Sequence, residues 1–392
     1  MHKIDTAERR RRLAVRHHLA PACRAIDIVT AAGDMVGLHG TDPGSVYLGA
    51  LARTEGITPA GMQRALYEDR ALLKILGMRR TMFVVPRDLA ATITSAVTDT
   101  IARRERKRLV NMVSEAGAVD GDIEAWLNEV EAETIAALDA KGQATASELT
   151  KVVPGLRVQI PIGTSKKWSG TVGVSTRMLF LLSAEARIIR GRPRGTWVSS
   201  LYNWAPMTSW LGAPLDRQPM ADAQADLVRR WLRTYGPGTI KDLKWWAGWT
   251  VAETKRALAA VGAVEIALDE GKGYALAEDL AISPPVGDWV ALTPALDSTT
   301  MGWNERGWYL GAHVNRLFDR NGNAGPAIWC DGRIVGGWAQ RRSGEVVTKL
   351  LEDVGKAART AVEEEAARIT AWLDQTRVVP RFRTPLEQEL SA

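Results

Sequence analysis

The stretch Leu227–Leu276 shows the fold of this chain most clearly; it reads LVRRWLRTYGPGTIKDLKWWAGWTVAETKRALAAVGAVEIALDEGKGYAL. Its first residues place apolar side chains at helical spacing up to Tyr235, where Gly-Pro-Gly ends the helix. Thr239 and Thr250 stand where the N-caps of two further helices are expected. Two short apolar runs follow within 263–276, separated by a glycine-containing turn. Helix, short helix, helix and β-hairpin is the element order of a winged-helix domain.

The same order of elements occurs twice more before this stretch, which indicates domain duplication. The first block contains helical patterns and a closing strand, at 5–19, 22–33, 45–54, 58–69 and 80–86. The second block contains three predicted helices, at 121–140, 145–149 and 175–186. We interpret the residues that follow, 187–198, as two strands joined by a basic turn.

From Pro284 onward the pattern changes to short strands, at 289–292, 327–330 and 333–335. The last two are joined by Asp331-Gly332, a type I′ hairpin signal. An acidic helix at 352–375 and a basic tail with Arg381 and Arg383 close the chain.

We therefore expect an α+β fold that is mainly α, with three tandem winged-helix domains (helix-turn-helix plus β-hairpin) and a small C-terminal β-rich module. The expected boundaries are 1–118 for the N-terminal helix and first winged helix, and 119–217 for the second winged helix with its basic wing. The third winged helix is expected at 218–282, and the β-rich module with its C-terminal helix at 283–392.

Composition excludes several classes of protein. With 392 residues, 46% apolar and 24% charged, the chain has the composition of a soluble globular protein of several domains. Its two cysteines, Cys23 and Cys330, are too far apart in sequence for zinc-finger spacings or a disulfide framework. His17 and His18 are adjacent and face different sides of a helix, so we expect no metal ion, and no cofactor either. No apolar run reaches the length of a membrane span, so we expect a cytoplasmic protein without membrane contact.

No motif of nucleotide-binding P-loops, dinucleotide-binding folds, zinc proteases or serine hydrolases occurs in the sequence.

Positive charge is concentrated in one part of the chain. Residues 151–217 carry a net charge of +8, although the whole chain carries only +6. A second basic cluster occupies Arg103–Arg108. Such concentration favours a polyanion, and nucleic acid is the commonest polyanion in a cytoplasm; a solvated basic face is the plainer alternative. We expect duplex DNA as the partner, bound mainly through its phosphates.

The segment Arg190-Gly-Arg-Pro-Arg-Gly195 has two interpretations. It resembles the core of an AT-hook, in which extended arginines lie in a narrow minor groove. It also stands where the wing of the second winged helix is expected. We favour the wing, because apolar strands flank the segment on both sides. Both interpretations lead to DNA.

The turn Gly37-Leu-His-Gly-Thr-Asp-Pro-Gly44 brings three groups with catalytic potential together. An imidazole, a hydroxyl and a carboxylate at His39, Thr41 and Asp42 can jointly hold and polarise a water molecule. The alternative is structural: Thr41 or Asp42 caps the helix that starts near Pro43.

Several of these motifs together resemble the winged-helix DNA glycosylases. The resemblance is carried by Gly37–Pro43, Ala52-Arg53, Met78–Val85, Tyr202–Pro206, Tyr235–Trp246 and Asp331–Trp338, and it covers nearly the whole chain. It implies three tandem winged helices plus a small β-barrel-like module, arranged as a C-shaped DNA channel. It also implies excision of bulky N-alkylated purines, mainly N7-alkylguanine and N3-alkyladenine.

The site motif departs from that family's pattern. The resemblance implies a glutamine-apolar-glutamine motif, and here His39 and Thr41 stand at its ends with Gly40 between them. We therefore expect His39, helped by Thr41 or Asp42, to activate the water. The side chains expected to contact DNA are Arg53, Arg79, Arg80, Lys166, Lys167, Arg177, Arg190, Arg192 and Arg194.

Two functions stay open at this point. The chain is either a DNA glycosylase-like enzyme that acts in repair of alkylation damage, or a catalytically silent DNA-binding protein, such as a regulator or a nucleoid-associated protein. Three winged helices leave no evident effector domain, and no separate dimerisation helix is visible; both points disfavour a simple regulator. We expect a monomer.

Overall fold

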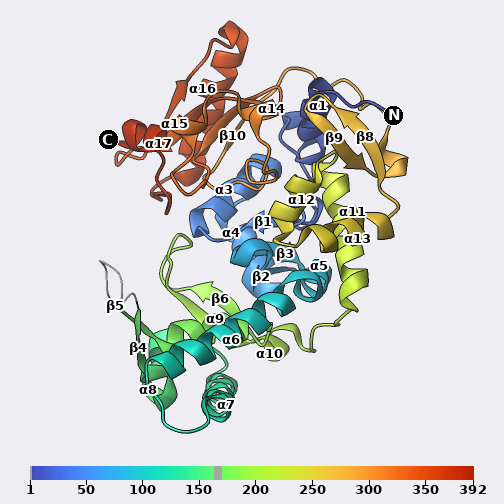
Figure 1. The fold of residues 1–392 in the computed structure, drawn as a ribbon. Coiled ribbons are helices and arrows are strands. Elements are labelled where there is room, and N and C mark those ends of the chain that lie inside the picture. The colour runs from blue at the N-terminus through green and yellow to red at the C-terminus, as the bar shows by residue number, and fades with distance from the viewer. Residues whose placement is uncertain (1, 163–169) are drawn as a thin grey trace.

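The computed structural model describes residues 2–162 and 170–392. Its fold is mixed α+β and mainly helical, with several small antiparallel sheets, as expected for the fold class. In Figure 1 the first block lies at the centre, apart from α1 at the upper right, and the second block lies below it. The third block lies at the upper right of that view, and the C-terminal module at the upper left.

The first block consists of helices packed on a three-stranded sheet. Its helices are α1 (Thr6–Arg16), α2 (Ile28–Asp34), α3 (Pro43–Arg53) and α4 (Pro59–Gln63), and a π-helical turn continues α4 to Glu68. The strands β1 (Leu38–His39), β2 (Leu72–Leu76) and β3 (Met82–Pro86) pair in the order β1-β3-β2. Only β3 was expected, and it begins at Met82 because Arg79 and Arg80 adopt positive φ angles of 54° and 63° in the preceding turn.

The second block begins after a long helical connection through α5 (Arg87–Ile93) and α6 (Asp99–Glu115). Its helices are α7 (Ile123–Lys141), α8 (Ala146–Val152) and α9 (Val174–Ala184). Two hairpins accompany them, β4 (Gln159–Ile162) with β5 (Gly170–Gly173), and β6 (Ile188–Pro193) with β7 (Tyr202–Pro206).

The expectation of two strands within 187–198 was wrong. This segment holds a single strand, β6. Its partner, β7, begins only at residue 202, after the loop that follows β6. Arg190 and Arg192 therefore lie on a strand with a bulge, and not in the turn.

The third block confirms the expected order of elements. It consists of α11 (Met220–Tyr235), α12 (Ile240–Ala247), α13 (Val251–Ala260), β8 (Val264–Leu268) and β9 (Gly271–Ala275), preceded by α10 (Met207–Leu211). Thr239 caps α12 and Thr250 caps α13, each in a capping box with an acidic residue three positions later.

The C-terminal module contains a four-stranded antiparallel sheet in sequential order. Its strands are β10 (Val290–Thr293), β11 (Ala327–Cys330), β12 (Arg333–Gln340) and β13 (Val346–Leu350). Its helices are α14 (Gly307–Leu310), α15 (Val314–Leu317), α16 (Gly355–Leu373) and α17 (Pro385–Ser391). Asp331 and Gly332 both have positive φ, as the hairpin signal predicted.

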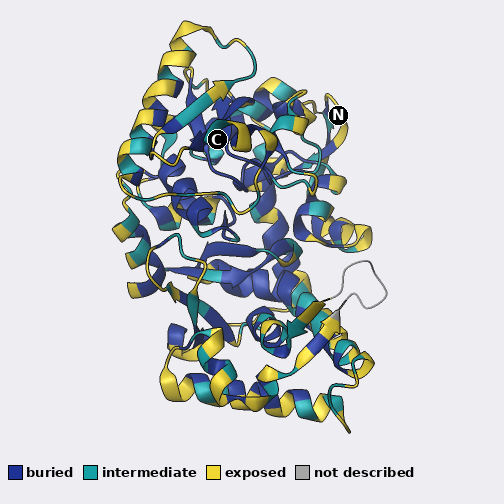
Figure 2. Ribbon diagram, turned by 90° about the vertical axis from the view of Figure 1, so that its left-hand side faces the viewer, coloured by how far each residue is buried: buried dark blue, intermediate teal, exposed yellow. Residues whose placement is uncertain are grey.

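The buried side chains form two main clusters. One runs through the first block, the third block and the C-terminal module and includes Ile189, Trp197 and Ala205 at the β6–β7 hairpin. The other lies in the second block around α7 and α9. Figure 2 shows the buried residues concentrated toward the middle of the molecule and the exposed residues on the outer helices. The second block is thus attached to a larger body along β2, β3 and β6.

Candidate active site

A cavity of about 590 Å³ opens where the first block, the second block and the C-terminal tail meet. Its walls include the turn Gly40–Pro43 between β1 and α3, and Lys74 of β2. Arg190 of β6 and Arg381 of the C-terminal tail add two more cations, and aromatic side chains come from Tyr67, Trp197 and Tyr202. Segments far apart in the sequence therefore surround one largely polar space.

Asp42 has two structural partners in the wall of this cavity. Its Oδ1 accepts a hydrogen bond from Gly44 N at 3.0 Å and caps α3, and its Oδ2 accepts one from Arg381 N at 2.9 Å. Asp42 is only 5% exposed, yet it lines the cavity, and a carboxylate has about four acceptor positions, so it can accept further hydrogen bonds. The neighbouring Thr41 accepts a long hydrogen bond of 3.4 Å from Met82 N through its Oγ1.

His39 lies behind this turn and is only 5% exposed. Its backbone N donates to Ser298 Oγ at 3.0 Å, and its ring lies 5.4 Å from that of Phe83. The Nδ1 atom is buried and has no hydrogen-bond partner among the described residues. Burial, with a contribution from the positive charge of Arg79, lowers the pKa of His39 to about 3. The imidazole is therefore neutral under ordinary assay conditions.

We expect the free energy of unfolding to fall as the pH is lowered from 7 to 5, because His39 and His17 are both buried as neutral imidazoles. Burial also lowers the pKa of His17 well below its ordinary value. The unfolded chain binds protons at both residues near pH 6.5, whereas folded His39 binds one only near pH 3. Unfolding therefore takes up protons in this window, and the expected loss at pH 5 is roughly 2 kcal/mol for each histidine.

Urea unfolding at pH 7.5, 6 and 5 measures this dependence. His39→Gln should make the dependence on pH shallower below pH 6, while His2→Gln, at an exposed position, should leave it unchanged. An equal slope in the His39→Gln variant would contradict a neutral, buried His39.

Lys74 is the functional candidate that the sequence did not reveal. It stands at the centre of β2, opposite Val84 of β3, and is the only side chain of that strand that is not fully buried. Burial and the positive charge of Arg190 lower the pKa of Lys74 to about 8, although Asp42 acts in the opposite direction. The one available signal was a single lysine inside the apolar run Leu72-Leu-Lys-Ile-Leu76.

The three arginines of the predicted basic wing differ in their partners. Arg190 packs over the ring of Tyr202, with 4.4 Å between the guanidinium carbon and the ring centroid. Arg192 and Arg194 are more exposed and form ion pairs with Glu68 at 2.9 Å and Glu148 at 2.7 Å.

The other expected DNA contacts lie in different surroundings. Arg53 is fully buried and forms a bidentate ion pair with Asp297, so in this structure its guanidinium cannot reach a phosphate. Arg177 of α9 is half-buried, near the cations Arg108 and Arg80. Lys166 and Lys167 lie outside the described residues.

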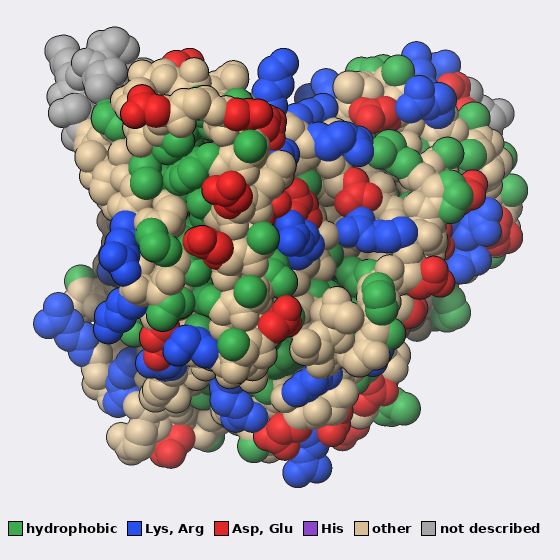
Figure 3. All heavy atoms as spheres, turned by 90° about the horizontal axis from the view of Figure 1, so that it is seen from below, with side chains coloured by type: hydrophobic (Ala, Val, Ile, Leu, Met, Phe, Trp, Pro, Cys, Tyr) green, Lys and Arg blue, Asp and Glu red, His purple; other side chains and the backbone are tan. Residues whose placement is uncertain are grey.

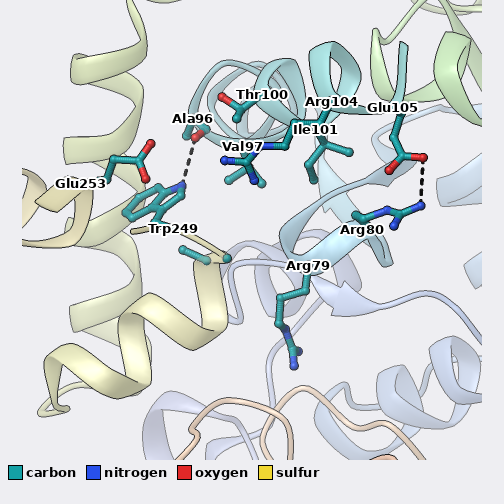
Figure 4. A pocket seen from close by; sticks show the side chains of 12 residues that line it. Arg79, Arg80, Ala96, Val97, Thr100, Ile101, Arg104, Glu105, Trp249 and Glu253 are labelled. Atoms are coloured by element: carbon teal, nitrogen blue, oxygen red, sulfur yellow. Dashed lines mark hydrogen bonds and ion pairs between the residues drawn. The ribbon is translucent and has the colours of Figure 1, made fainter. Parts of the chain in front are cut away.

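Arg79 and Arg80 border a second, smaller cavity of about 180 Å³ between α6 and the third block. Figure 4 shows Arg79 pointing away from Trp249, and Arg80 paired with Glu105 at 3.0 Å. The Arg79 guanidinium lies 3.8 Å from the ring centroid of Trp245, and burial lowers the pKa of Arg79 to about 10. The structure thus separates Arg79 and Arg80 from the cavity that holds Thr41 and Asp42.

Lysine and arginine side chains do not form one continuous patch on the face drawn in Figure 3, where acidic side chains lie among them. Ion pairs also join basic and acidic side chains between α6 and the residues that follow it: Arg106 with Glu124 and Glu131, and Arg217 with Asp99. The net charge of a sequence segment therefore overstates the number of its basic side chains that are left without an acidic partner in the fold.

Across residues 2–162 and 170–392, no group of three or more histidine, cysteine, aspartate or glutamate side chains is arranged to hold a metal ion. None of the helices described there has both the length and the apolar character that crossing a membrane requires.

Comparison with solved structures finds the DNA glycosylase AlkZ of Streptomyces sahachiroi, with a TM-score of 0.72. The match covers 95% of this chain and 97% of that chain at 20% sequence identity, which shows a shared fold. A comparison with curated proteins gives no match. The family model for AlkZ-like DNA glycosylases matches residues 32–372, a span that includes the turn at His39–Asp42, Lys74 and Arg190. The resemblance seen in the sequence is thereby confirmed, and the chain belongs to the AlkZ-like DNA glycosylase family.

Proposed function

We propose that this chain binds duplex DNA as a monomer and hydrolyses the N-glycosidic bond of bulky N-alkylated purines at the cavity beside Gly40–Pro43. The observation that carries the proposal is the meeting of a hydroxyl, a carboxylate and three cationic side chains in that one cavity. Family membership supports DNA as the class of substrate.

The chemistry suits this set of side chains. Alkylation at N7 of guanine or N3 of adenine leaves the base cationic, so the base departs without a general acid. The protein has to stabilise an oxocarbenium-like sugar and place a water molecule beside it. A negative charge and a hydroxyl within the cavity meet both needs, and neither step requires a cofactor.

We assign these two tasks to Asp42 and Thr41. The Asp42 carboxylate is held by Gly44 N and Arg381 N, so its orientation is set before DNA arrives. Thr41 presents a hydroxyl that can orient the water but not deprotonate it. His39, the base expected from the sequence, remains the competing candidate, although its low pKa makes it a weak base.

DNA binding in this proposal involves all three helix-hairpin blocks. We read them as three winged helices with boundaries after residues 118, 217 and 282, and the β6–β7 hairpin as the basic wing of the second. The wing arginines and the cations of the cavity would face the phosphates of a duplex lying across the blocks.

The wing should contribute to the dependence of DNA affinity on salt. If Arg190, Arg192 and Arg194 each neutralise one phosphate, their joint replacement by alanine should reduce the slope of log K against log salt by about 2.7. The ion pairs of Arg192 and Arg194 are partly exposed and contribute little free energy. Replacing their carboxylate partners by DNA phosphates therefore costs little free energy.

The matched control replaces Arg316, Arg341 and Arg359, which form exposed ion pairs in the C-terminal module. This variant makes the same change in net charge and should leave the slope nearly unchanged. Equal slopes for the wild type and the wing variant in a salt titration would remove the wing from the interface.

Incubation with methylated and bulkier adducted duplexes, followed by mild alkali and a sizing gel, tests the activity itself. Release of the modified base leaves an alkali-labile abasic site, and we expect strand cleavage above spontaneous depurination. Cleavage at the spontaneous rate on every adduct would favour the catalytically silent DNA-binding protein.

A further inference from the structure

Lys74 is an amine without an anionic partner in the cavity. Its neighbours in β2 are all buried apolar residues, and its own side chain lines the cavity. Among the described residues its Nζ has no ion pair and no hydrogen bond. Exposed lysines such as Lys151 share that property, but Lys74 is the lysine that lines this cavity among the residues the structure describes. Lys74 is partly exposed and lines the cavity, so its amine is free to meet a ligand bound there.

Burial, with a contribution from the positive charge of Arg190, lowers the pKa of Lys74 and keeps part of this amine neutral. Arg190 and Arg381 bring positive charge, Asp42 brings a negative charge that Gly44 N and Arg381 N already engage, and Tyr67 and Tyr202 are the phenols of the lining. With the pKa of Lys74 near 8, about a quarter of the amine is neutral at pH 7.5, compared with about 0.1% for an ordinary lysine. Only the neutral form is a nucleophile.

We propose that Lys74 attacks C1′ of an abasic site held in this cavity, forming an imine, and that the chain then cleaves the DNA strand on the 3′ side of that site. The inference rests on the proposed function, because base excision there would leave the C1′ aldehyde within reach of this amine. Arg190 and Arg381 suit the flanking phosphates.

The reaction balances without an oxidant, a reductant or a metal. The Nζ–C1′ bond forms, and the aldehyde oxygen leaves as water with the two hydrogens of the neutral amine. The imine takes up one proton from water to become an iminium, which makes the C2′ proton acidic. Loss of that C2′ proton returns one proton to water. The electron pair forms C2′=C3′ as the C3′–O bond breaks, so the phosphate stays on the downstream fragment. Hydrolysis of the imine returns the free amine.

A duplex whose abasic site is made beforehand, by a uracil glycosylase acting on deoxyuridine, tests this step apart from base excision. In the presence of cyanoborohydride we expect a covalent protein–DNA product whose peptide map places the adduct on Lys74. Lys74→Arg, which keeps the positive charge, should lower the yield at least tenfold. Lys151→Arg, at an exposed lysine on α8, is the matched control and should trap like the wild type.

Two further readouts complete the test. Trapping should rise with pH and level off above about pH 8, where an ordinary surface lysine would still be gaining reactivity. Lys74→Met checks that the effect follows the amine, and circular dichroism checks that both variants fold. Absence of a trapped product, or a product on other lysines that survives Lys74→Arg, would overturn the proposal. Because the abasic site is supplied, such a failure leaves the excision assay as a separate test of the proposed function.

Discussion

Asp42→Asn should lower the rate of base excision by about 100- to 10,000-fold. Asparagine is as good an N-cap as aspartate, so the start of α3 should persist. What the variant loses is the negative charge that would face the oxocarbenium-like sugar and accept a proton from the attacking water. Single-turnover excision of 7-methylguanine from a duplex measures this loss. DNA affinity, measured in parallel, should not fall, because the change removes a negative charge from the cavity at which we propose that DNA binds.

Two companion variants separate the candidates within the turn. Thr41→Val should lose less activity than Asp42→Asn, since a hydroxyl orients a water without deprotonating it. If His39 were the base, His39→Ala would abolish excision while Asp42→Asn retained it. Excision by Asp42→Asn at the wild-type rate would therefore move the chemistry away from this carboxylate.

Arg53→Met should destabilise the protein by on the order of 3–5 kcal/mol. The Arg53 guanidinium and the Asp297 carboxylate are both inaccessible to solvent and joined by two hydrogen bonds of 2.6 and 2.8 Å. Arg53 also donates to Thr299 Oγ1 at 2.9 Å, which in turn lies 2.8 Å from Nδ1 of His17. Removing the guanidinium leaves a buried carboxylate without its partner, and the network that joins α3 to α1 and the C-terminal module loses its centre.

Chemical denaturation of Arg53→Met and of a surface control measures this effect. Arg316→Met, which breaks an exposed pair with Glu389, should cost less than about 1 kcal/mol. Adding Asp297→Leu to Arg53→Met should recover stability, because apolar side chains can replace a buried ion pair. A stable Arg53→Met variant with weakened DNA binding would instead support the contact with DNA that the sequence suggested for this residue.

Local signals in the sequence predicted the third block well. The capping boxes at Thr239 and Thr250 and the turn at Asp331-Gly332 act over three or four residues, so each could be read without knowing the fold. Strands whose partners are distant were missed or misplaced. β2 lacks the alternation of a half-buried strand because both of its faces are covered, and the pairing of β6 with β7 spans a loop.

The sequence therefore determined the family, the helical blocks and the turn at His39–Asp42, because these depend on neighbouring residues. Only the tertiary structure decided which charges are free. Arg53 and Lys74 are both cations in apolar stretches of the sequence. Arg53 pairs with Asp297, more than 200 positions away, whereas Lys74 lines a cavity. The cavity itself is assembled from four separate segments of the chain. Burial and pairing set the chemistry of a charged group, and both are properties of contacts between segments that no local pattern records.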